Sequence, residues 1–132
     1  MNYLAHIYLS DCDEELMFGN FFGDFIRSKE FNFYSKRIQQ GILLHREIDL
    51  FTDAHPTFKA IVEILRPSQR KYAPVTLNIL NDYLLSISWN QYNNMDLRSF
   101  CDRFYDQIKK TKVRIPSRLK AKLNLMLKHN FL

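Results

Sequence analysis

The sequence predicts an all-α protein that forms one compact helical domain over residues 1–132. Apolar residues recur every three or four positions along most of the chain, which is the spacing of a helix with one buried face. No segment alternates apolar and polar residues as a strand would. Only three glycines and four prolines occur, and 46% of the residues are hydrophobic. This composition favours a folded helical chain over a disordered one.

The first half of the chain predicts three helices. A short helix spans residues 2–9, and the polar cluster 10–13 then caps a second helix that continues to residue 27. Six of the eleven phenylalanines fall within residues 18–33, so we expect this region to supply much of the core. A third helix covers residues 36–51.

The prolines mark the predicted helix boundaries in the second half. Pro56 lies in the first turn of a fourth helix, Pro67 ends it, Pro74 opens a fifth helix, and Pro116 opens the last. The fifth helix continues to about residue 92, and residues 93–96 start a sixth. The last helix ends in apolar residues, so either it packs back on the core or the chain is a shortened form of a longer protein.

The net charge of +5 is unevenly distributed along the chain. The segment from residue 107 onward holds eight basic residues and no acidic one, whereas residues 1–106 have a net charge of −3. The basic residues are Lys109, Lys110, Lys112, Arg114, Arg118, Lys120, Lys122 and Lys128. This segment either docks an acidic protein or nucleic acid, or forms a solvated helix face.

The cysteines and the apolar runs indicate the compartment. Cys12 and Cys101 have no framework spacing, so we expect free thiols in a reducing cytoplasm. No run approaches the roughly 18 apolar residues that span a bilayer, and the N-terminus lacks the features of a signal peptide. The sequence therefore predicts a cytoplasmic protein that does not cross a membrane.

The most unusual stretch runs from His45 to Asp49. On a helix these two residues lie one turn apart, and they continue the apolar stripe of Ile38 and Ile42. A histidine and a carboxylate that point inward need partners, because an unpaired buried polar group costs roughly 2–7 kcal/mol. Either a shared divalent cation or a buried His–Asp hydrogen bond would satisfy both.

Two further carboxylates repeat this pattern. Asp24 follows Met17 and Phe21 at helical spacing, and Asp82 lies on the apolar stripe of the fifth predicted helix. Three helices that each direct a carboxylate or imidazole inward are best explained by one shared site. Oxygen ligands with a single imidazole suit Mn2+ or Mg2+ better than a thiolate-type zinc site.

The remaining candidates have weaker signals. His6 lies among apolar neighbours and suits either a catalytic or a core position. Arg46 could reach an anionic phosphate or form a surface ion pair. Asn20 lies one turn before Asp24 and could orient it, and we expect His55 to cap the fourth helix or lie on the surface. No phosphate-binding loop, nucleotide-binding glycine motif or nucleophile elbow is present.

Several strings, taken together, resemble the acyl carrier protein phosphodiesterase family. They are residues 2–6 (NYLAH), 19–25 (GNFFGDF), 41–49 (GILLHREID) with Thr52 and Asp53, 73–77 (APVTL), and 82–85 (DYLL) with Trp89. They occur in the family's order and cover about the first 92 residues. Two features depart from the family: Tyr83 stands where a His usually follows the late Asp, and family members continue beyond this C-terminus.

The resemblance implies an all-helical fold related to HD-type phosphohydrolases. It also implies a Mn2+-dependent reaction that releases 4′-phosphopantetheine from holo acyl carrier protein. The expected metal ligands are Asp24, His45, Asp49 and Asp82. His6 would then orient a ligand or transfer a proton, and Arg46 would counter the phosphate charge. A metal held in this way can polarise a phosphoryl oxygen and lower the pKa of a bound water.

The acidic carrier protein would give the basic C-terminal segment a purpose. Two alternatives stay open at this point. The first is a related phosphohydrolase that acts on a nucleotide or another small phosphoester. The second is a non-enzymatic basic helical module that binds RNA or protein, and in which the inward acids are only structural.

Overall fold

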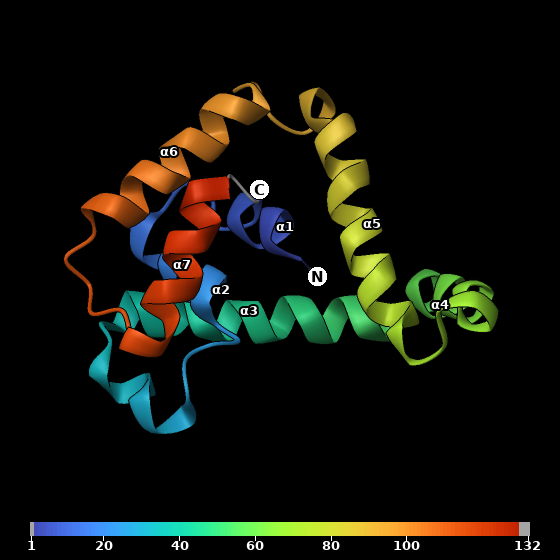
Figure 1. The fold of residues 1–132 in the computed structure, drawn as a ribbon, viewed down its shortest axis with the longest axis horizontal. Coiled ribbons are helices and arrows are strands. Elements are labelled where there is room, and N and C mark those ends of the chain that lie inside the picture. The colour runs from blue at the N-terminus through green and yellow to red at the C-terminus, as the bar shows by residue number, and fades with distance from the viewer. Residues whose placement is uncertain (1, 130–132) are drawn as a thin grey trace.

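The computed structural model describes residues 2–129, and this part of the chain is helical with no strand (Figure 1). The α-helices are α1 (Tyr3–Tyr8), α2 (Glu14–Phe22), α3 (Lys36–Ala54), α4 (Pro56–Gln69), α5 (Ala73–Ile87), α6 (Leu97–Lys110) and α7 (Ser117–His129). Short 3-10 segments are η1 (Ser28–Phe33), η2 (Arg70–Tyr72) and η3 (Trp89–Gln91). The predicted all-α class is confirmed. Among the described helices, none has the length and apolar character needed to cross a membrane.

Helices α2 and α3 pack with their backbones in direct contact, and two of the chain's three glycines permit this. A Cβ at Gly19 would collide with the carbonyl oxygen of Ile38, and a Cβ at Gly41 would collide with that of Leu16. Side chains at either position would therefore force the helices apart. Ser35 begins α3 by accepting a hydrogen bond from the N–H of Ile38, and Asp13 caps α2 in the same way through Leu16.

The main core lies where α1, α2, α6 and α7 meet the first half of α3 (Figure 1). Phe21 and Phe104 are its largest fully buried side chains, and their rings pack at 4.8 Å. Burial of each such ring contributes roughly 1.5–3 kcal/mol. Helix α7 adds Leu123 and Met126 to this core, so the described part of the last helix packs back on the protein. Phe131 and Leu132 lie outside the described residues.

Helices α4 and α5 form an arm at the far end of α3 (Figure 1). Their shared core contains only four buried residues: Phe58, Val62, Ala73 and Leu77. Helix α5 also contacts α1. There the carboxylate of Asp82 accepts hydrogen bonds from the N–H groups of Leu4 at 2.9 Å and Ala5 at 3.3 Å. The Asp82 side chain thus bonds the arm to the N-terminal helix.

Several predicted boundaries were wrong. Helix α2 ends at Phe22 rather than at residue 27, because the chain turns where Phe25 and Ile26 both donate to the carbonyl oxygen of Phe22. The prediction that Pro67 ends α4 fails as well. A proline near the end of a helix removes only one hydrogen bond, and α4 continues until Arg70, whose φ of 51° leaves the helical region.

Other boundaries differ by a few residues. Helix α3 runs three residues beyond the predicted end, and α5 ends at Ile87 instead of about residue 92. The phenylalanine-rich segment is only partly in the core: Phe18, Phe21 and Phe22 are buried, but Phe33 is 80% exposed. The predicted free thiols are confirmed, with Cys12 exposed and Cys101 buried.

Candidate metal centre

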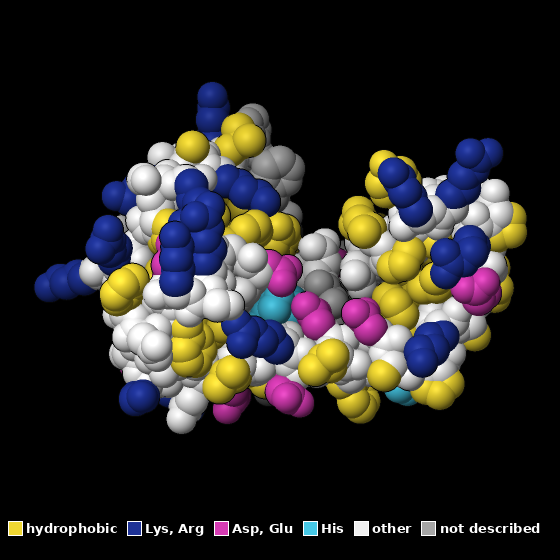
Figure 2. All heavy atoms as spheres, turned by 90° about the horizontal axis from the view of Figure 1, so that it is seen from below, with side chains coloured by type: hydrophobic (Ala, Val, Ile, Leu, Met, Phe, Trp, Pro, Cys, Tyr) yellow, Lys and Arg dark blue, Asp and Glu magenta, His cyan; other side chains and the backbone are white. Residues whose placement is uncertain are grey.

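Three of the predicted site residues meet where α1 crosses α3. His6 comes from α1, and His45 and Asp49 come from successive turns of α3. One ligand atom from each residue lies within 4.8 Å of the others, which is a spacing that could hold a metal ion. In the space-filling view, histidine and acidic side chains meet in a hollow between the arm and the rest of the molecule (Figure 2).

The two imidazoles face the carboxylates through their Nε2 atoms. The rings of His6 and His45 are stacked, with centroids 4.0 Å apart and an interplanar angle of 12°. His6 Nε2 lies 3.2 Å from Asp49 Oδ1, and His45 Nε2 lies 3.2 Å from Asp49 Oδ2. Asp24, in the turn after α2, places its Oδ1 at 3.0 Å from His45 Nε2. Asp24 therefore lies beside the group, with a side chain that is 72% exposed.

The opposite side of each ring fixes where its proton lies. His45 Nδ1 is 2.6 Å from the backbone oxygen of Asn20, and His6 Nδ1 is 2.7 Å from the side-chain oxygen Oδ1 of Asn20. Both oxygens accept hydrogen bonds, so both Nδ1 atoms donate. A neutral ring protonated on Nδ1 carries a lone pair on Nε2.

Within the described chain, neither buried Nε2 atom has a hydrogen-bond partner of good geometry, although carboxylate oxygens lie within 3.2 Å. Lone pairs on nitrogen that face lone pairs on carboxylate oxygen repel each other unless a positive charge lies between them. Either a proton or a cation can supply that charge. The donor set of two imidazoles and two carboxylates therefore fits a divalent metal ion.

The pKa values reflect this mutual attraction. Burial lowers the pKa of His45, but the close contacts with Asp24 and Asp49 outweigh burial and raise it to about 9. Burial raises the pKa of Asp49, whereas His45 and His6 lower it, and the net result is well below the ordinary value. The contact with His45 likewise lowers the pKa of Asp24 despite partial burial. The site thus keeps its carboxylates ionised and attracts positive charge.

Gly23, the third glycine of the chain, makes room for the His45 ring. A Cβ at this position would lie 3.0 Å or less from three atoms of the His45 side chain. Because Gly23 directly follows α2, the end of that helix can approach α3 closely at this point. This contact sets the position of His45 relative to Asp24, the next residue in the chain.

The structure places Asp82 outside this group. Both oxygens of its carboxylate accept from backbone N–H groups at the start of α1, as described above. Burial raises the pKa of Asp82 and outweighs these two hydrogen bonds, which lower it. Asp82 therefore supports the helix that carries His6, and its predicted role as a ligand stays a prediction.

The other candidates take different places. Arg46 is exposed on α3, and in the described part of the chain no ion-pair partner approaches it. His55 caps α4, with its Nδ1 accepting from the N–H of Thr57 at 3.2 Å, as expected. Asp53 is exposed in the last turn of α3. Asn20, which by its spacing could have oriented Asp24, has an amide that bonds to His6 and Ser10 instead.

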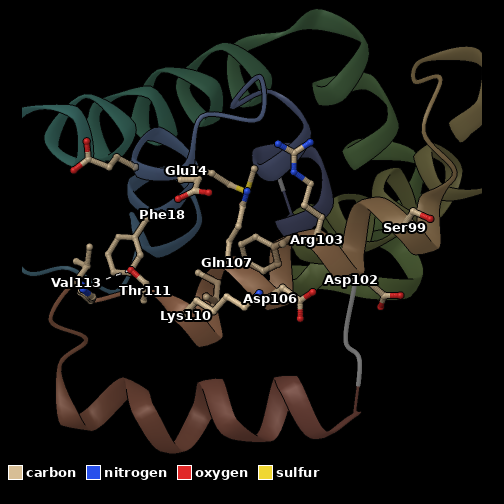
Figure 3. A pocket seen from close by; sticks show the side chains of 15 residues that line it. Glu14, Phe18, Ser99, Asp102, Arg103, Asp106, Gln107, Lys110, Thr111 and Val113 are labelled. Atoms are coloured by element: carbon tan, nitrogen blue, oxygen red, sulfur yellow. Dashed lines mark hydrogen bonds between the residues drawn. The ribbon is translucent and has the colours of Figure 1, made fainter.

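A large pocket lies away from the histidine pair. It has a volume of about 730 Å³ between α2 and α6, and Phe18, Arg103 and Gln107 are among the residues that line it (Figure 3). None of its lining residues belongs to the group of imidazoles and carboxylates. The chemistry of the candidate centre is therefore carried by the shallow hollow of Figure 2 rather than by this pocket.

Sequence reasoning missed the supporting residues. Ser10 is fully buried and accepts from the Asn20 amide, but its position after a short helix indicated only a cap. The function of Asn20 depends on contacts across 14 and 25 positions in sequence, which helical spacing cannot reveal. The sequence held one signal of a close helix contact near Asn20: Gly19 and Gly23 lie on either side of it, and Gly41 lies on the facing helix.

Comparison with known proteins gives a consistent result. The family model described as "Acyl carrier protein phosphodiesterase" matches residues 1–132. A protein of that name from Enterobacter sp. (strain 638) is 36% identical over 109 residues, which is 82% of this chain and 56% of the relative. The relative from Photorhabdus laumondii is 36% identical over 91 residues, covering 69% of this chain and 46% of its own length.

A third relative of the same name, from Serratia proteamaculans, is 33% identical over 109 residues, again 82% of this chain and 56% of the relative. The chain thus spans about half the length of the curated relatives it matches. No solved structure matches it. The expected relation to HD-type phosphohydrolases therefore stays a prediction.

Proposed function

Because this chain belongs to the acyl carrier protein phosphodiesterase family, we propose that it hydrolyses the phosphodiester bond of holo acyl carrier protein. In this reaction water adds across the bond between the phosphorus atom and the serine oxygen of the carrier. The serine hydroxyl is restored, giving the apo carrier, and 4′-phosphopantetheine leaves with the phosphate.

The single observation that carries the proposal is the pair of buried Nε2 atoms that face the Asp49 carboxylate without a hydrogen bond of good geometry to any described residue. We propose that His6, His45 and Asp49 hold a divalent cation, Mn2+ or Mg2+, with Asp24 as a further ligand. His6 thus joins the ligand set, rather than acting only as an orienting or proton-transfer residue. When bound, such an ion stabilises negative charge on a phosphoryl oxygen during hydrolysis.

The residues around this group have distinct tasks in the proposal. Asp49 contacts both imidazoles and keeps them on one side of the hollow. Arg46, next to His45 on α3 and exposed, is free to neutralise a phosphate oxygen of the substrate.

The basic C-terminal segment supports an acidic partner. Two of its cations are used within the fold: Arg118 pairs with Glu30 at 2.8 Å, and Lys122 lies 4.3 Å from the ring centre of Phe25. The other six are exposed. We propose that these cations attract holo acyl carrier protein and speed its association.

Intact-mass spectrometry of the carrier protein tests this function. We expect the protein with Mn2+ to convert the holo carrier to the apo form, EDTA to stop the conversion, and added Mn2+ to restore it. Asp49→Asn is the inactive control, since it keeps the shape of the side chain but removes its charge. A folded, Mn2+-loaded protein that leaves the carrier mass unchanged would contradict the proposed substrate.

Charge reversal separates carrier docking from chemistry. Lys109→Glu, Lys112→Glu and Arg114→Glu together should slow the reaction with carrier protein at low salt and flatten its salt dependence. Hydrolysis of a small phosphodiester such as bis(p-nitrophenyl) phosphate should stay within about twofold of the wild type, because these residues lie away from the histidines. Equal reaction rates of wild type and variant with carrier protein would remove the docking role.

A further inference from the structure

Besides the backbone hydrogen bonds of its helix, Asn20 makes four hydrogen bonds from a fully buried position in α2, and these four bind the histidine pair or its surroundings. Its amide nitrogen donates to the carbonyl oxygen of His6 at 2.7 Å and to Ser10 Oγ at 2.9 Å. Its side-chain oxygen accepts from His6 Nδ1, and its backbone oxygen accepts from His45 Nδ1. One residue thus contacts both imidazoles through different atoms.

The orientation of the Asn20 amide is determined by its partners. The carbonyl oxygen of His6 can only accept, so the nitrogen of the amide must face it. The oxygen Oδ1 must therefore face the His6 ring, and it can bind only a ring that carries its proton on Nδ1. Ser10 Oγ also donates to the carbonyl oxygen of His6 at 2.8 Å, so its lone pairs are available for the amide.

We propose that Asn20 is a positioning residue that holds both imidazoles with their protons on Nδ1 and so presents both Nε2 lone pairs to the same ion. The proposal rests on the metal centre proposed above, and it adds the residue that orients two of the ligands of that centre. Partners of this kind on the far side of a metal-binding histidine fix its tautomer and ring orientation. Here both acceptor oxygens belong to Asn20, so one residue of α2 binds a histidine of α1 and a histidine of α3.

The two contacts differ in a way that makes the proposal testable. The bond to His6 comes from the Asn20 side chain, whereas the bond to His45 comes from the backbone. A substitution of Asn20 therefore releases His6 alone. Without the Oδ1 acceptor, the nearest acceptor for the His6 ring is Asp49 Oδ1, at 3.2 Å from Nε2. The proton should then move to Nε2 and block the lone pair.

The direct test is the tautomer of each histidine in metal-free protein, read from long-range proton–nitrogen correlation spectra. These are recorded at about pH 10.5, above the raised pKa of His45. In wild type we expect His6 and His45 to carry the proton on Nδ1. His55 provides the opposite reference, because its Nδ1 accepts from Thr57 and the proton must lie on Nε2. Single His→Gln variants assign the signals.

Three variants separate positioning from packing. Asn20→Leu, of similar size but without an acceptor, should move the His6 proton to Nε2 and leave His45 unchanged. Asn20→Asp keeps an acceptor and should keep the His6 proton on Nδ1, although both donated hydrogen bonds are lost. Gln39→Leu is the matched control: it removes another buried amide, whose bond to the Tyr34 carbonyl lies elsewhere. If Asn20→Leu does not fold, Asn20→Ala, which adds no bulk, replaces it.

Calorimetric titration with Mn2+ gives the second readout. Asn20→Leu should weaken Mn2+ binding about 10–100-fold, the usual effect of losing such a partner, whereas Gln39→Leu should stay within about twofold of the wild type. Asn20→Asp should bind more tightly than Asn20→Leu. The proposal is overturned if His6 keeps its proton on Nδ1 in Asn20→Leu, or if the Asp and Leu variants behave alike in both readouts.

The two readouts also separate this proposal from the proposed function. The tautomers are measured without metal, so they test the role of Asn20 even if no ion binds. A wild-type protein with both protons on Nδ1 but no Mn2+ affinity would contradict the metal centre and leave the tautomer control by Asn20 standing. A wild-type His6 with its proton on Nε2 would overturn the role of Asn20 whatever the Mn2+ affinity.

Discussion

Helices α2 and α3 touch backbone to backbone, whereas α4 and α5 are held apart by side chains and share a core of only four buried residues. Gly19 and Gly41 lie at the first contact, and Gly23, directly after α2, faces the His45 side chain. On the second, α5 exposes more than half of Val75, Ile79, Tyr83 and Ile87 to solvent. The α2–α3 contact lies beside the stacked rings of His6 and His45. The α4–α5 arm carries Asp82, whose carboxylate binds the start of α1 instead of the histidines.

The contrast between these two helix pairs shows how backbone contact holds the polar side chains of the site in position. Direct backbone contact leaves no side chain that could rearrange between Asn20 and His45, so their hydrogen bond of 2.6 Å is set by the helix pair itself. Asp82 of the arm reaches the site indirectly, through the N-terminal amides of α1, and α4 contacts α3. We therefore expect substitutions in the α2–α3 contact to have large effects and those in the arm to have smaller ones.

The largest effect should come from Gly41→Ala. The new Cβ meets the backbone of α2, which cannot move aside as a flexible side chain would. We expect a loss of about 1–3 kcal/mol in the free energy of unfolding, despite the higher helix propensity of alanine, together with weaker Mn2+ binding. Urea unfolding and calorimetry measure the two. Val75→Ala on the exposed face of α5 should change stability by about 0.5 kcal/mol or less.

Gly23→Ala sharpens the same prediction, because its Cβ meets the His45 side chain rather than backbone. Here the ring can shift, so we expect a smaller loss of stability than in Gly41→Ala but a clear loss of Mn2+ affinity. If Gly41→Ala and Val75→Ala proved equally stable, the contrast between the two regions would be wrong.

Asp82→Ala tests the link between the arm and the site. Loss of the acceptor for the Leu4 and Ala5 N–H groups should cost about 0.5–2 kcal/mol in the free energy of unfolding, as for other helix caps. It should weaken Mn2+ binding indirectly, through the helix that carries His6. Asp82→Asn keeps one acceptor oxygen for these two N–H groups, so it should lose less stability and less Mn2+ affinity than Asp82→Ala. A loss of Mn2+ binding in Asp82→Asn equal to that in Asp49→Asn would instead make Asp82 a ligand.

The smallest effect concerns the contact of α7 with η1. The hydrogen bonds from Arg118 lower the pKa of Glu30 from 4.5 to about 2. Because the folded-state pKa is depressed, this stabilisation is fully present above pH 4.5 and is lost as the pH falls through about 2. Arg118→Ala should therefore be less stable than wild type at pH 7, and the difference should shrink at about pH 2.5 in urea unfolding. Arg98→Ala, 3.9 Å from Asp102 and largely exposed, should differ little from wild type at either pH.

The helices could be predicted because their signals are local. Asp13, Ser35 and Asp96 cap α2, α3 and α6 through side-chain oxygens, as their residue types indicate. The interior ends were less predictable, because α4 is ended by the backbone of Arg70 rather than by Pro67. The early end of α2 was likewise hard to predict, because the helical spacing of apolar residues continues into the turn in which Phe25 and Ile26 donate to the Phe22 carbonyl oxygen.

The candidate site was predictable in part for the same reason. His45 and Asp49 lie on one helix face, so spacing alone brought them together, and Asp24 was indicated by its apolar neighbours. His6 could not be assigned, since its contact with Asp49 joins positions that are far apart in sequence. Asp82 satisfied the same spacing rule as Asp24, yet its oxygens bind the start of α1, a partner that only the tertiary structure reveals.

The most direct test of the central claim is a crystal of the protein soaked in Mn2+ and measured for anomalous scattering. We predict one strong peak in contact with His6 Nε2, His45 Nε2 and the Asp49 carboxylate, with Asn20 still bonded to both Nδ1 atoms. The same soak of Asp49→Asn should lose the peak. A fully soaked crystal with no peak at the histidine pair, or with the ion bound only elsewhere, would contradict the account.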